Sequence, residues 1–475
     1  MTQTSLKTLD GKQHVSSADD LQKLKTGLQG KLCLPGDPGY DEARTIWNAM
    51  IDRKPAVIVR AAAAADVVLA VQFARQHHLL VAIRGGGHNI AGNAVCEGGL
   101  MIDLSPMKKV KIDPKAKTAY VEPGATLGEF DAAAQAHGLA TPLGINSTTG
   151  VAGFTLGGGF GWISRKYGLT VDNLISVDIV TADGKLISAS EKENPDLFWA
   201  VRGGGGNFGV VTAFEYRLHP VGPEILSGLI IHPFAQAKPL LQEWRRLVAS
   251  LPDEISAWVV MRKAPPLPFL PPEVHGKEIL IFAVAAVGDM KAAEKALAPL
   301  RALGKPIVDV IGPTPFLGWQ QALDPLLTPG ARNYWKSHDF KKVEDGLFET
   351  LVEAAGDLPS DETEIILVNL GGAVNRVAAN ATAYPHRDVE FIMNVHARWR
   401  DAAQDQKCIA WARKLFDAAG KFATGGVYVN FMPEDEGQRV QKGAYGPNYE
   451  RLAKLKAKYD PANLFRMNQN IKPTA

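Results

Sequence analysis

Cysteine is scarce in this chain: only Cys33, Cys96 and Cys408 occur among its 475 residues. Three thiols so far apart form neither a disulfide framework nor a zinc-binding pattern, which indicates a reducing compartment. Long hydrophobic runs are also missing, and residues 1–20 contain no apolar segment of the signal-peptide type. We therefore expect a soluble, cytoplasmic protein that does not bind membranes.

An excess of charge of one sign is missing as well. Lysine and arginine together number 52, aspartate and glutamate 50, and the formal net charge is +2. The basic residues are spread along the chain without interleaved aromatics, so we expect no nucleic-acid partner. The sequence also lacks an HExxH motif, a GxSxG elbow and a GxxxxGK[ST] loop. These absences argue against a metal site, a serine hydrolase of that type and a P-loop nucleotide site.

Glycine, in contrast, is plentiful, and its most informative run is Arg84-Gly85-Gly86-Gly87-His88-Asn89. The run follows an apolar segment, residues 79–83, that is typical of a buried strand. Successive glycines let backbone N–H groups approach a ligand, and such turns form concavities that bind anions. The pattern predicts room for a phosphate-bearing cofactor beside the reactive imidazole of His88. A plain glycine turn with a surface histidine is the alternative interpretation.

Two further glycine clusters follow, at residues 153–161 and 202–209. The second contains GxGxxG as Gly204, Gly206 and Gly209. A dinucleotide fingerprint requires a strand before this motif and a helix after it. Here a predicted helix over 195–201 precedes it and a β-rich run over 210–216 follows, so we reject a Rossmann site. Three glycine turns in one α+β region suggest another way of enclosing a large cofactor.

The first 220 residues alternate between short helices and strands. Residues 66–77 and 127–137 have helical spacing, the latter with Thr126 as N-cap and Gly138 as its stop. An Asp183-Gly184 pair between two β-rich runs predicts a hairpin. Predicted strands cover residues 56–60, 79–83, 100–104, 109–112, 118–121, 175–180, 185–188 and 210–216.

The region from 221 to about 420 predicts a different architecture. Strands over 276–287 and 364–368 and helices over 290–303 and 343–355 favour an antiparallel sheet with covering helices. The proline-rich residues 265–272 predict a loop. The aromatic residues Trp319, Tyr334 and Trp335 are expected in the core rather than in a pocket.

Taken together, these clusters resemble FAD-linked oxidases of the vanillyl-alcohol-oxidase superfamily, above all its berberine-bridge-enzyme-like and 6-hydroxy-D-nicotine-oxidase-like members. The resemblance spans residues 56–471. It rests on the Arg84–Asn89 run and on the motifs GVAG (150–153), LGGGFG (156–161), KYGLTVDN (166–173), DLFWAVRG (196–203), GNFGVVT (206–212), YVNF (428–431) and DPANLF (460–465).

The resemblance implies an α+β fold in which a two-part PCMH-type FAD-binding domain joins a substrate domain built on an antiparallel sheet with covering helices. The FAD-binding domain is expected at 1–220, with its core at about 50–220. The substrate domain is expected at 221–425. A C-terminal segment, 426–475, is expected to return to the FAD-binding domain.

The resemblance also implies that the flavin is bonded covalently to His88, because an imidazole nitrogen can add to the flavin 8α-methyl position in its quinone-methide form. Many relatives carry a second, cysteinyl bond, but Asn146 occupies that position, so we expect a single attachment. The expected cofactor-binding residues are Arg84, Gly85, Gly86, Gly87, His88, Asn89, Thr149, Gly150, Gly153, Gly158, Gly159, Gly206, Asn207, Gly209, Val210, Val211, Tyr428, Asn430, Asn468 and Asn470.

The catalytic base implied by the resemblance is Tyr428. Some relatives place a carboxylate after a Gly-Gly pair of the substrate domain, but residues 371–376 contain none. A tyrosine has a reference pKa of about 10 and needs a nearby positive charge, or developing flavin charge, to act near neutral pH. The alternative is a strand tyrosine that positions the flavin. Asn468 and Asn470 are expected to contact the flavin ring region rather than to catalyse.

The function implied is that of an oxidase. Hydride passes from a small or medium-sized alcohol, amine or sugar-type substrate to flavin N5, and dioxygen reoxidises the flavin with release of H2O2. Thr149 occupies the position, directly before Gly150, at which the resemblance implies control of oxygen access to the flavin, and its small side chain favours an open pocket. The alternatives are a dehydrogenase of the same fold and a flavin-binding protein without turnover. Neither the substrate nor the oligomeric state follows from the sequence.

Overall fold

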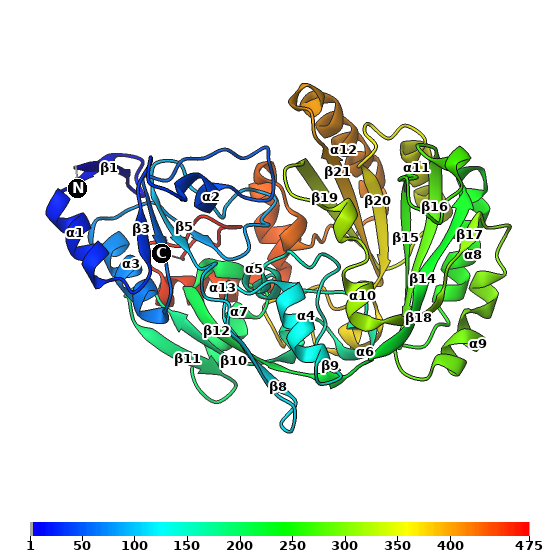
Figure 1. Cartoon of the computed structure of the whole chain (residues 1–475), viewed down its shortest axis with the longest axis horizontal. Helices are drawn as coiled ribbons and strands as arrows, with labels where there is room; N and C mark the ends of the chain where they lie inside the picture. Colours follow the sequence, from blue (N-terminus) through cyan, green and yellow to red (C-terminus); the bar gives the residue numbers. More distant parts are fainter. Residues whose placement is uncertain (1–2, 475) are drawn as a thin grey trace.

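The structure, a computed structural model, describes residues 3–474. The described residues form three larger sheets and two two-stranded ones, and Figure 1 shows the C-terminal chain (red) lying among the N-terminal elements (blue). The α+β architecture predicted above is confirmed. In the described part of the chain, no helix is both long enough and apolar enough to cross a membrane.

The first sheet has four strands in the order β3-β4-β6-β5. The predicted unit of strand, helix and strand is present, but β6 lies between the two strands of that unit and pairs in parallel with both. Helices α1 and α3 pack with the sheet through one apolar cluster. The strands are β3 (Lys31–Cys33), β4 (Val57–Arg60), β5 (Val81–Arg84) and β6 (Leu100–Asp103); the helices are α1 (Ala18–Gly27) and α3 (Ala64–Gln76).

The residues before 50, outside the core expected from the sequence, are folded. They form a hairpin of β1 (Thr4–Lys7) and β2 (Gln13–Ser16), helix α1, strand β3 and the short helix α2 (Tyr40–Arg44). Buried Asp66 ties this segment to α3, because its carboxylate accepts hydrogen bonds from the backbone N–H groups of Gln29, Gly30 and Ala62. The N-terminal segment is therefore part of the packed fold.

The second sheet has five antiparallel strands in the order β11-β10-β12-β8-β7. The predicted hairpin around Asp183-Gly184 joins β10 to β11, and Thr126 caps α4 in a capping box with Glu129. The strands are β7 (Val110–Asp113), β8 (Thr118–Val121), β10 (Leu174–Val180), β11 (Leu186–Ser190) and β12 (Val210–Arg217). The accompanying elements are α4 (Leu127–Gln135), β9 (Leu139–Ala140), α5 (Val151–Leu156), α6 (Ser164–Tyr167), α7 (Pro195–Val201) and β13 (His219–Pro220).

The third sheet has eight antiparallel strands, in the order β17-β14-β16-β15-β20-β21-β19 with β18 paired to β14. Its strands are β14 (Glu224–Pro233), β15 (Ile255–Lys263), β16 (Glu278–Ala286), β17 (Val308–Asp309), β18 (Gly312–Pro315), β19 (Arg332–Phe340), β20 (Glu364–Asn369) and β21 (Phe391–Trp399). Helices cover one face of this sheet, as predicted: α8 (Ala237–Val248), α9 (Met290–Arg301), α11 (Asp345–Ala355) and α12 (Asp405–Ala419). The short helix α10 (Phe316–Gln320) packs near α4 instead.

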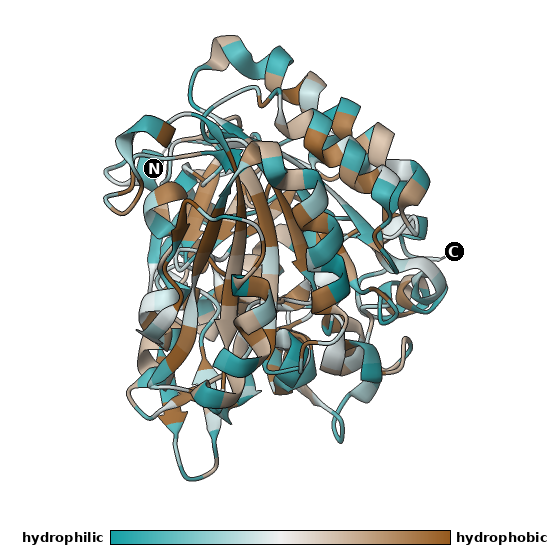
Figure 2. Cartoon of the chain, turned by 90° about the vertical axis from the view of Figure 1, so that its right-hand side faces the viewer, coloured by the Kyte–Doolittle hydropathy of each residue, from teal (hydrophilic) through white to brown (hydrophobic). Residues whose placement is uncertain are grey.

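Alternation along these strands divides their side chains between two cores. On β21, Met393 and Val395 pack under the helices, whereas Ile392 belongs to the core shared with the second sheet. Figure 2 shows the long, largely hydrophobic strands of the sheet behind helices that are polar on their outer side. The face away from the helices is the one that meets the glycine loops.

The C-terminal chain folds back onto the first two sheets. Helix α13 (Tyr449–Tyr459) lies beside α7, and its Lys456 forms a fully buried ion pair with Asp460. The Lys456 ammonium also donates to the backbone carbonyls of Asn207 and Phe465. Beyond α13, the Ile471 N–H donates to the Asn207 side chain. These contacts join the third glycine cluster to the end of the chain.

Candidate functional site

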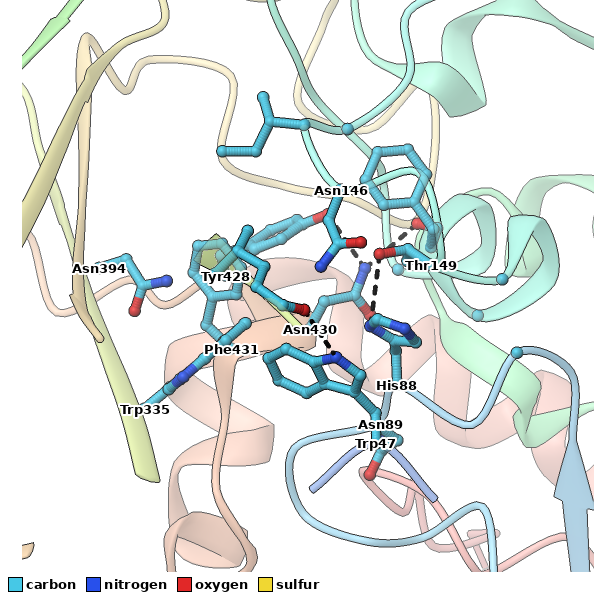
Figure 3. A pocket seen from close by; sticks show the side chains of 18 of the residues that line it. Trp47, His88, Asn89, Asn146, Thr149, Trp335, Asn394, Tyr428, Asn430 and Phe431 are labelled. Atoms are coloured by element: carbon cyan, nitrogen blue, oxygen red, sulfur yellow. Dashed lines mark hydrogen bonds between the residues drawn. The ribbon is translucent and has the colours of Figure 1, made fainter. Parts of the chain in front are cut away.

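A cavity of about 360 Å³ lies between the glycine loops and the third sheet. We call its glycine-lined side the floor; it is formed by residues 85–89, 144–157 and 205–211. We call the opposite side the roof; it is formed by β14, β15, β16, β19, β20 and β21. Figure 3 shows the two sides facing each other, with His88 and Thr149 on one and Trp335 and Asn394 on the other.

Two glycines allow the floor loops to meet. A Cβ atom on Gly86 would lie 2.4 Å from the backbone nitrogen of Gly150, and a Cβ on Gly150 would lie 2.3 Å from that of Gly86. Only glycine permits this approach, which brings residues 84–89 against the start of α5. At Gly153 and Gly206, in contrast, an added Cβ would meet no atom within 4 Å. Side chains there would project into the open space of the cavity.

His88 lies at the centre of the floor. Its Nε2 is 3.0 Å from the Thr148 hydroxyl oxygen, and its Nδ1 is 3.4 Å from the Thr149 hydroxyl oxygen. The Thr148 hydroxyl donates to the side-chain oxygen of Asn146 at 2.7 Å. Because that proton is already used, the Thr148 oxygen is left to accept from His88 Nε2–H. This arrangement favours a tautomer in which Nδ1 carries the lone pair.

The charge state of His88 is fixed by its surroundings. Burial, reinforced by the positive charges of Arg398 and Arg84, lowers the pKa of His88 to about 3. The imidazole is therefore neutral at physiological pH, as a nucleophile or a hydrogen-bond acceptor must be. That this imidazole reacts with a cofactor stays a prediction.

Trp47 was not found by sequence reasoning, although it packs directly on His88. The two rings are stacked with centroids 4.8 Å apart, and the Arg398 guanidinium lies 5.0 Å from the Trp47 ring. The Trp47 indole N–H donates to the Leu327 carbonyl, and neighbouring Asn48 is hydrogen-bonded to Asn333. No motif marks this position, because Trp47 belongs to the segment joining α2 to β4.

Tyr428 lines the cavity but does not belong to a strand, which corrects the alternative of a strand tyrosine. It directly precedes a 3₁₀ turn, Val429–Phe431. Its hydroxyl accepts hydrogen bonds from the Gly159 N–H at 3.1 Å and from the Asn430 amide at 3.0 Å. Burial raises the pKa of Tyr428, and these two hydrogen bonds only partly offset the effect. The phenol is neutral at physiological pH.

Most of the other predicted residues gather at the floor. Asn89, Thr149, Asn207, Gly209, Val210, Val211, Asn430 and Asn468 line the cavity together with Gly85, Gly86 and Gly87. Asn468 leaves its buried side-chain oxygen without a hydrogen-bond partner in the described chain.

Four predicted residues lie behind the cavity lining rather than in it: Arg84, Gly158, Gly159 and Asn470. Arg84 donates to the Ala43 carbonyl and approaches Asp103 at 3.8 Å. Gly159 acts indirectly, through its N–H on the Tyr428 hydroxyl.

None of the three cysteines lines the cavity. All three are buried and free, and burial raises the pKa of Cys96 to about 12 and that of Cys408 to about 11. Among residues 3–474, no group of histidine, cysteine and acidic side chains could hold a metal ion.

The roof carries a polar row that the sequence did not indicate. Arg262 on β15, Glu364 on β20, His396 on β21 and Trp335 on β19 are register partners across four adjacent strands. All four line the cavity, which corrects the expectation that Trp335 belongs to the core. Trp319 and Tyr334 are absent from this lining, as expected.

Comparison with known proteins gives consistent matches. A family model described as "FAD binding domain" matches residues 55–190, and one described as "Berberine and berberine like" matches residues 427–472. An FAD-linked oxidoreductase of Bacillus subtilis (strain 168) is 33% identical over 459 residues, covering 94% of this chain and 98% of that protein. The (R)-6-hydroxynicotine oxidase of Paenarthrobacter nicotinovorans is 31% identical over 475 residues, covering 95% and 99%. The crystal structure of 6-hydroxy-D-nicotine oxidase from Arthrobacter nicotinovorans superposes with a TM-score of 0.85 at 29% identity, covering 94% and 98%.

Proposed function

Because this chain belongs to the berberine-bridge-like family of FAD-linked oxidoreductases, we propose that it is an oxidase holding FAD covalently through His88. Its substrate is a small or medium-sized organic molecule, and its second substrate is dioxygen. The observation that carries the proposal is the environment of His88: a neutral imidazole in the floor, beside glycines that leave space for a large group.

The residues present fit FAD. Gly153 and Gly206 keep the floor open where any side chain would occupy the cavity. The buried side-chain oxygen of Asn468, which has no partner in the described chain, can accept a hydrogen bond from a flavin N–H. The chemistry that FAD supplies when bound is acceptance of a hydride and electron transfer to dioxygen, which yields H2O2.

The floor residues prepare the attachment. Asn146 orients the Thr148 hydroxyl, which holds the Nε2 side of His88 and leaves the lone pair on Nδ1. We therefore assign Nδ1 as the bonding nitrogen. Asn146 itself offers an amide where a thiolate would be required, so a single attachment follows. Cys96 and Cys408 stay protonated and buried.

Tyr428 is assigned the removal of the substrate proton. The neutral phenol can accept that proton only after its own proton has passed to solvent. The phenolate would then take the substrate proton and return to the phenol, and the two donors to its oxygen, Gly159 N–H and Asn430, would stabilise the phenolate in the interval. The alternatives Tyr334 and Tyr384 are absent from the cavity lining, and Tyr334 is bonded to Asp435 and Arg413.

Thr149 favours an oxidase over a dehydrogenase. It lines the floor directly before Gly150, and its side chain is small. The test is stopped-flow reoxidation of photoreduced enzyme. An oxidase reoxidises faster than free reduced flavin, whereas an equal or slower rate assigns the dehydrogenase. Anaerobic bleaching by substrate excludes the third reading, a flavin-binding protein without turnover.

A further inference from the structure

The polar row in the roof has no role in the chemistry described so far. Arg262 Nη1 lies 2.8 Å from one Glu364 carboxylate oxygen, and His396 Nδ1 lies 3.0 Å from the other. The three side chains are at least nine-tenths buried. The Trp335 ring completes the row, with its centroid 4.3 Å from that of His396.

Packing alone does not require this row. The neighbouring cavity-facing positions on β15 and β20 are apolar, namely Trp258, Val260, Ile366 and Val368. Removing an ion pair from water is costly, and hydrophobic residues of similar volume often replace such pairs without loss of stability. A buried ion pair at one register of a cavity wall that is otherwise apolar apart from Asn394 therefore indicates a ligand site.

The row presents hydrogen-bond acceptors. Burial raises the pKa of Glu364, but the Arg262 charge and the His396 contact outweigh it and hold that pKa at about 2. Burial lowers the pKa of His396 despite the nearby carboxylate, so the imidazole is neutral. An ionised carboxylate beside Nδ1 favours a proton on that nitrogen, which leaves a lone pair on Nε2. Nε2 is buried without a partner in the described chain, and Nδ1, although close to Glu364, makes no well-aligned hydrogen bond to it.

The walls around the row are mostly hydrocarbon, with Asn394 as a polar neighbour. The roof strands contribute Leu229, Ile231, Val260, Ile279 and Ile281, and the proline-rich loop adds Leu270. A molecule with many hydroxyl groups would leave most of them unpaired against such walls, which costs free energy for each buried group. A mainly apolar molecule would instead be favoured by burial of its surface.

We propose that the Arg262–Glu364–His396 row binds a hydroxyl or N–H donor of the substrate, and that the substrate is an otherwise apolar, compact molecule rather than an oligosaccharide. This inference rests on the proposed function, because it concerns the substrate of the same cavity. Glu364 and His396 are specificity-determining residues in it, and Arg262 positions Glu364.

The test is binding to the FAD-loaded enzyme, measured by equilibrium dialysis so that turnover is not needed. The probes are 2-naphthol, 2-methoxynaphthalene and cellobiose. The first two differ chiefly in a hydrogen-bond donor. We expect 2-naphthol to bind at least about tenfold more tightly than 2-methoxynaphthalene, as one lost charge-assisted hydrogen bond implies. Cellobiose should bind more weakly than either.

Two variants locate the effect. Glu364→Gln and His396→Gln should each reduce the preference for 2-naphthol to less than about threefold, while binding of 2-methoxynaphthalene stays within about twofold. Glu278→Gln is the matched control, because Glu278 lies on β16 of the same sheet but is absent from the cavity lining. His396→Gln leaves the Arg262–Glu364 pair intact, so it covers the case in which Glu364→Gln fails to fold.

The proposal is overturned by equal binding of the two naphthalenes, by tighter binding of cellobiose, by binding of no probe at millimolar concentration, or by an unchanged preference in His396→Gln. None of these outcomes depends on whether flavin is covalently attached or reacts with dioxygen. Failure of the proposed function is read separately, from flavin retention and reoxidation.

Discussion

The floor and the roof of the cavity are built by different means. The floor uses closely approaching backbone, with Gly86 against Gly150, and one neutral imidazole, His88. The roof uses side chains on an eight-stranded sheet, apolar except for one charged row and Asn394. A ligand can approach the backbone of the floor closely only because the residues there are glycines. Such a surface suits one large ligand that does not vary, as a cofactor does not. Side chains at the surface of a sheet can be exchanged without disturbing the fold. The comparison therefore assigns the cofactor to the floor and the choice of substrate to the roof.

The largest expected effect comes from the floor. His88→Ala should abolish covalent attachment, so that all flavin appears in the supernatant after acid precipitation. The variant should still bind FAD, because the glycine loops are unchanged. His137→Ala, at an exposed histidine, is the control and should retain the yellow pellet. Covalent flavin in the His88→Ala pellet would contradict the assignment of His88, in the floor, as the residue that holds the cofactor.

Tyr428 lies where floor and roof meet, and its loss should affect rate rather than binding. Tyr428→Phe should slow anaerobic flavin reduction by roughly 10²–10⁴-fold, the range of general-base catalysis. Flavin content should stay near that of the wild type. Tyr334→Phe is the matched control, since Tyr334 is absent from the cavity lining. Near-normal reduction in Tyr428→Phe would reduce this residue to a structural role, and Tyr384 would be the next to test.

Substitution of Thr149 should distinguish the two half-reactions, flavin reduction by substrate and flavin reoxidation by dioxygen. Thr149→Leu should slow reoxidation of the reduced enzyme by about tenfold, equivalent to about 1.4 kcal/mol in the barrier. Anaerobic reduction by substrate should change little, so the ratio of the two rates in one preparation serves as the internal control. Equal slowing of both steps would mean that leucine distorts the floor instead of closing a path for dioxygen.

Substitution of Trp47 tests how strongly its stacked ring orients the His88 imidazole. Trp47→Ala removes the ring stacked on His88, and such contacts contribute about 0.5–1.5 kcal/mol. We expect covalent incorporation of added FAD into apoprotein to slow by roughly twofold to tenfold, with full attachment at long times. Trp47→Phe should recover most of the rate. Unchanged kinetics in Trp47→Ala would show that the threonine hydroxyls alone orient the imidazole.

The last prediction concerns pH. The pKa of His88 is about 3 in the folded state, below its ordinary value near 6.5, so the unfolded chain binds the additional proton between these values. The contribution of His88 to stability is therefore present above pH 6.5 and falls as pH decreases towards 3. In apoprotein, His88→Asn should lose less thermal stability than wild type between pH 6.5 and 4. Parallel curves for the two proteins would contradict the low pKa.

The sequence was most informative where chemistry lies in contiguous residues. The glycine runs identified the floor, and helix α7 was predicted with the bounds that it has, Pro195–Val201. The sequence did not reveal the roof row, because its members, from Arg262 to His396, come from four separate strands and meet only through the register of the sheet. Trp47 escaped for the same reason, since its neighbour His88 is reached by folding alone.

The order in which the strands pair could not be predicted from the sequence either. Strand β6 inserts between β4 and β5, which no local pattern could specify. The division of the chain at residues 220 and 425 and the cytoplasmic location stay predictions. So do the roles of the individual floor residues.

The most direct test of the account is the chemistry of the floor in the wild-type protein. The purified protein is acid-precipitated, digested with protease, and its peptides are mapped by mass spectrometry. The account predicts a yellow pellet and one flavin-bearing peptide containing His88, with the bond at Nδ1 and unmodified peptides for Cys96 and Cys408. A colourless pellet, or flavin on any other residue, would contradict it.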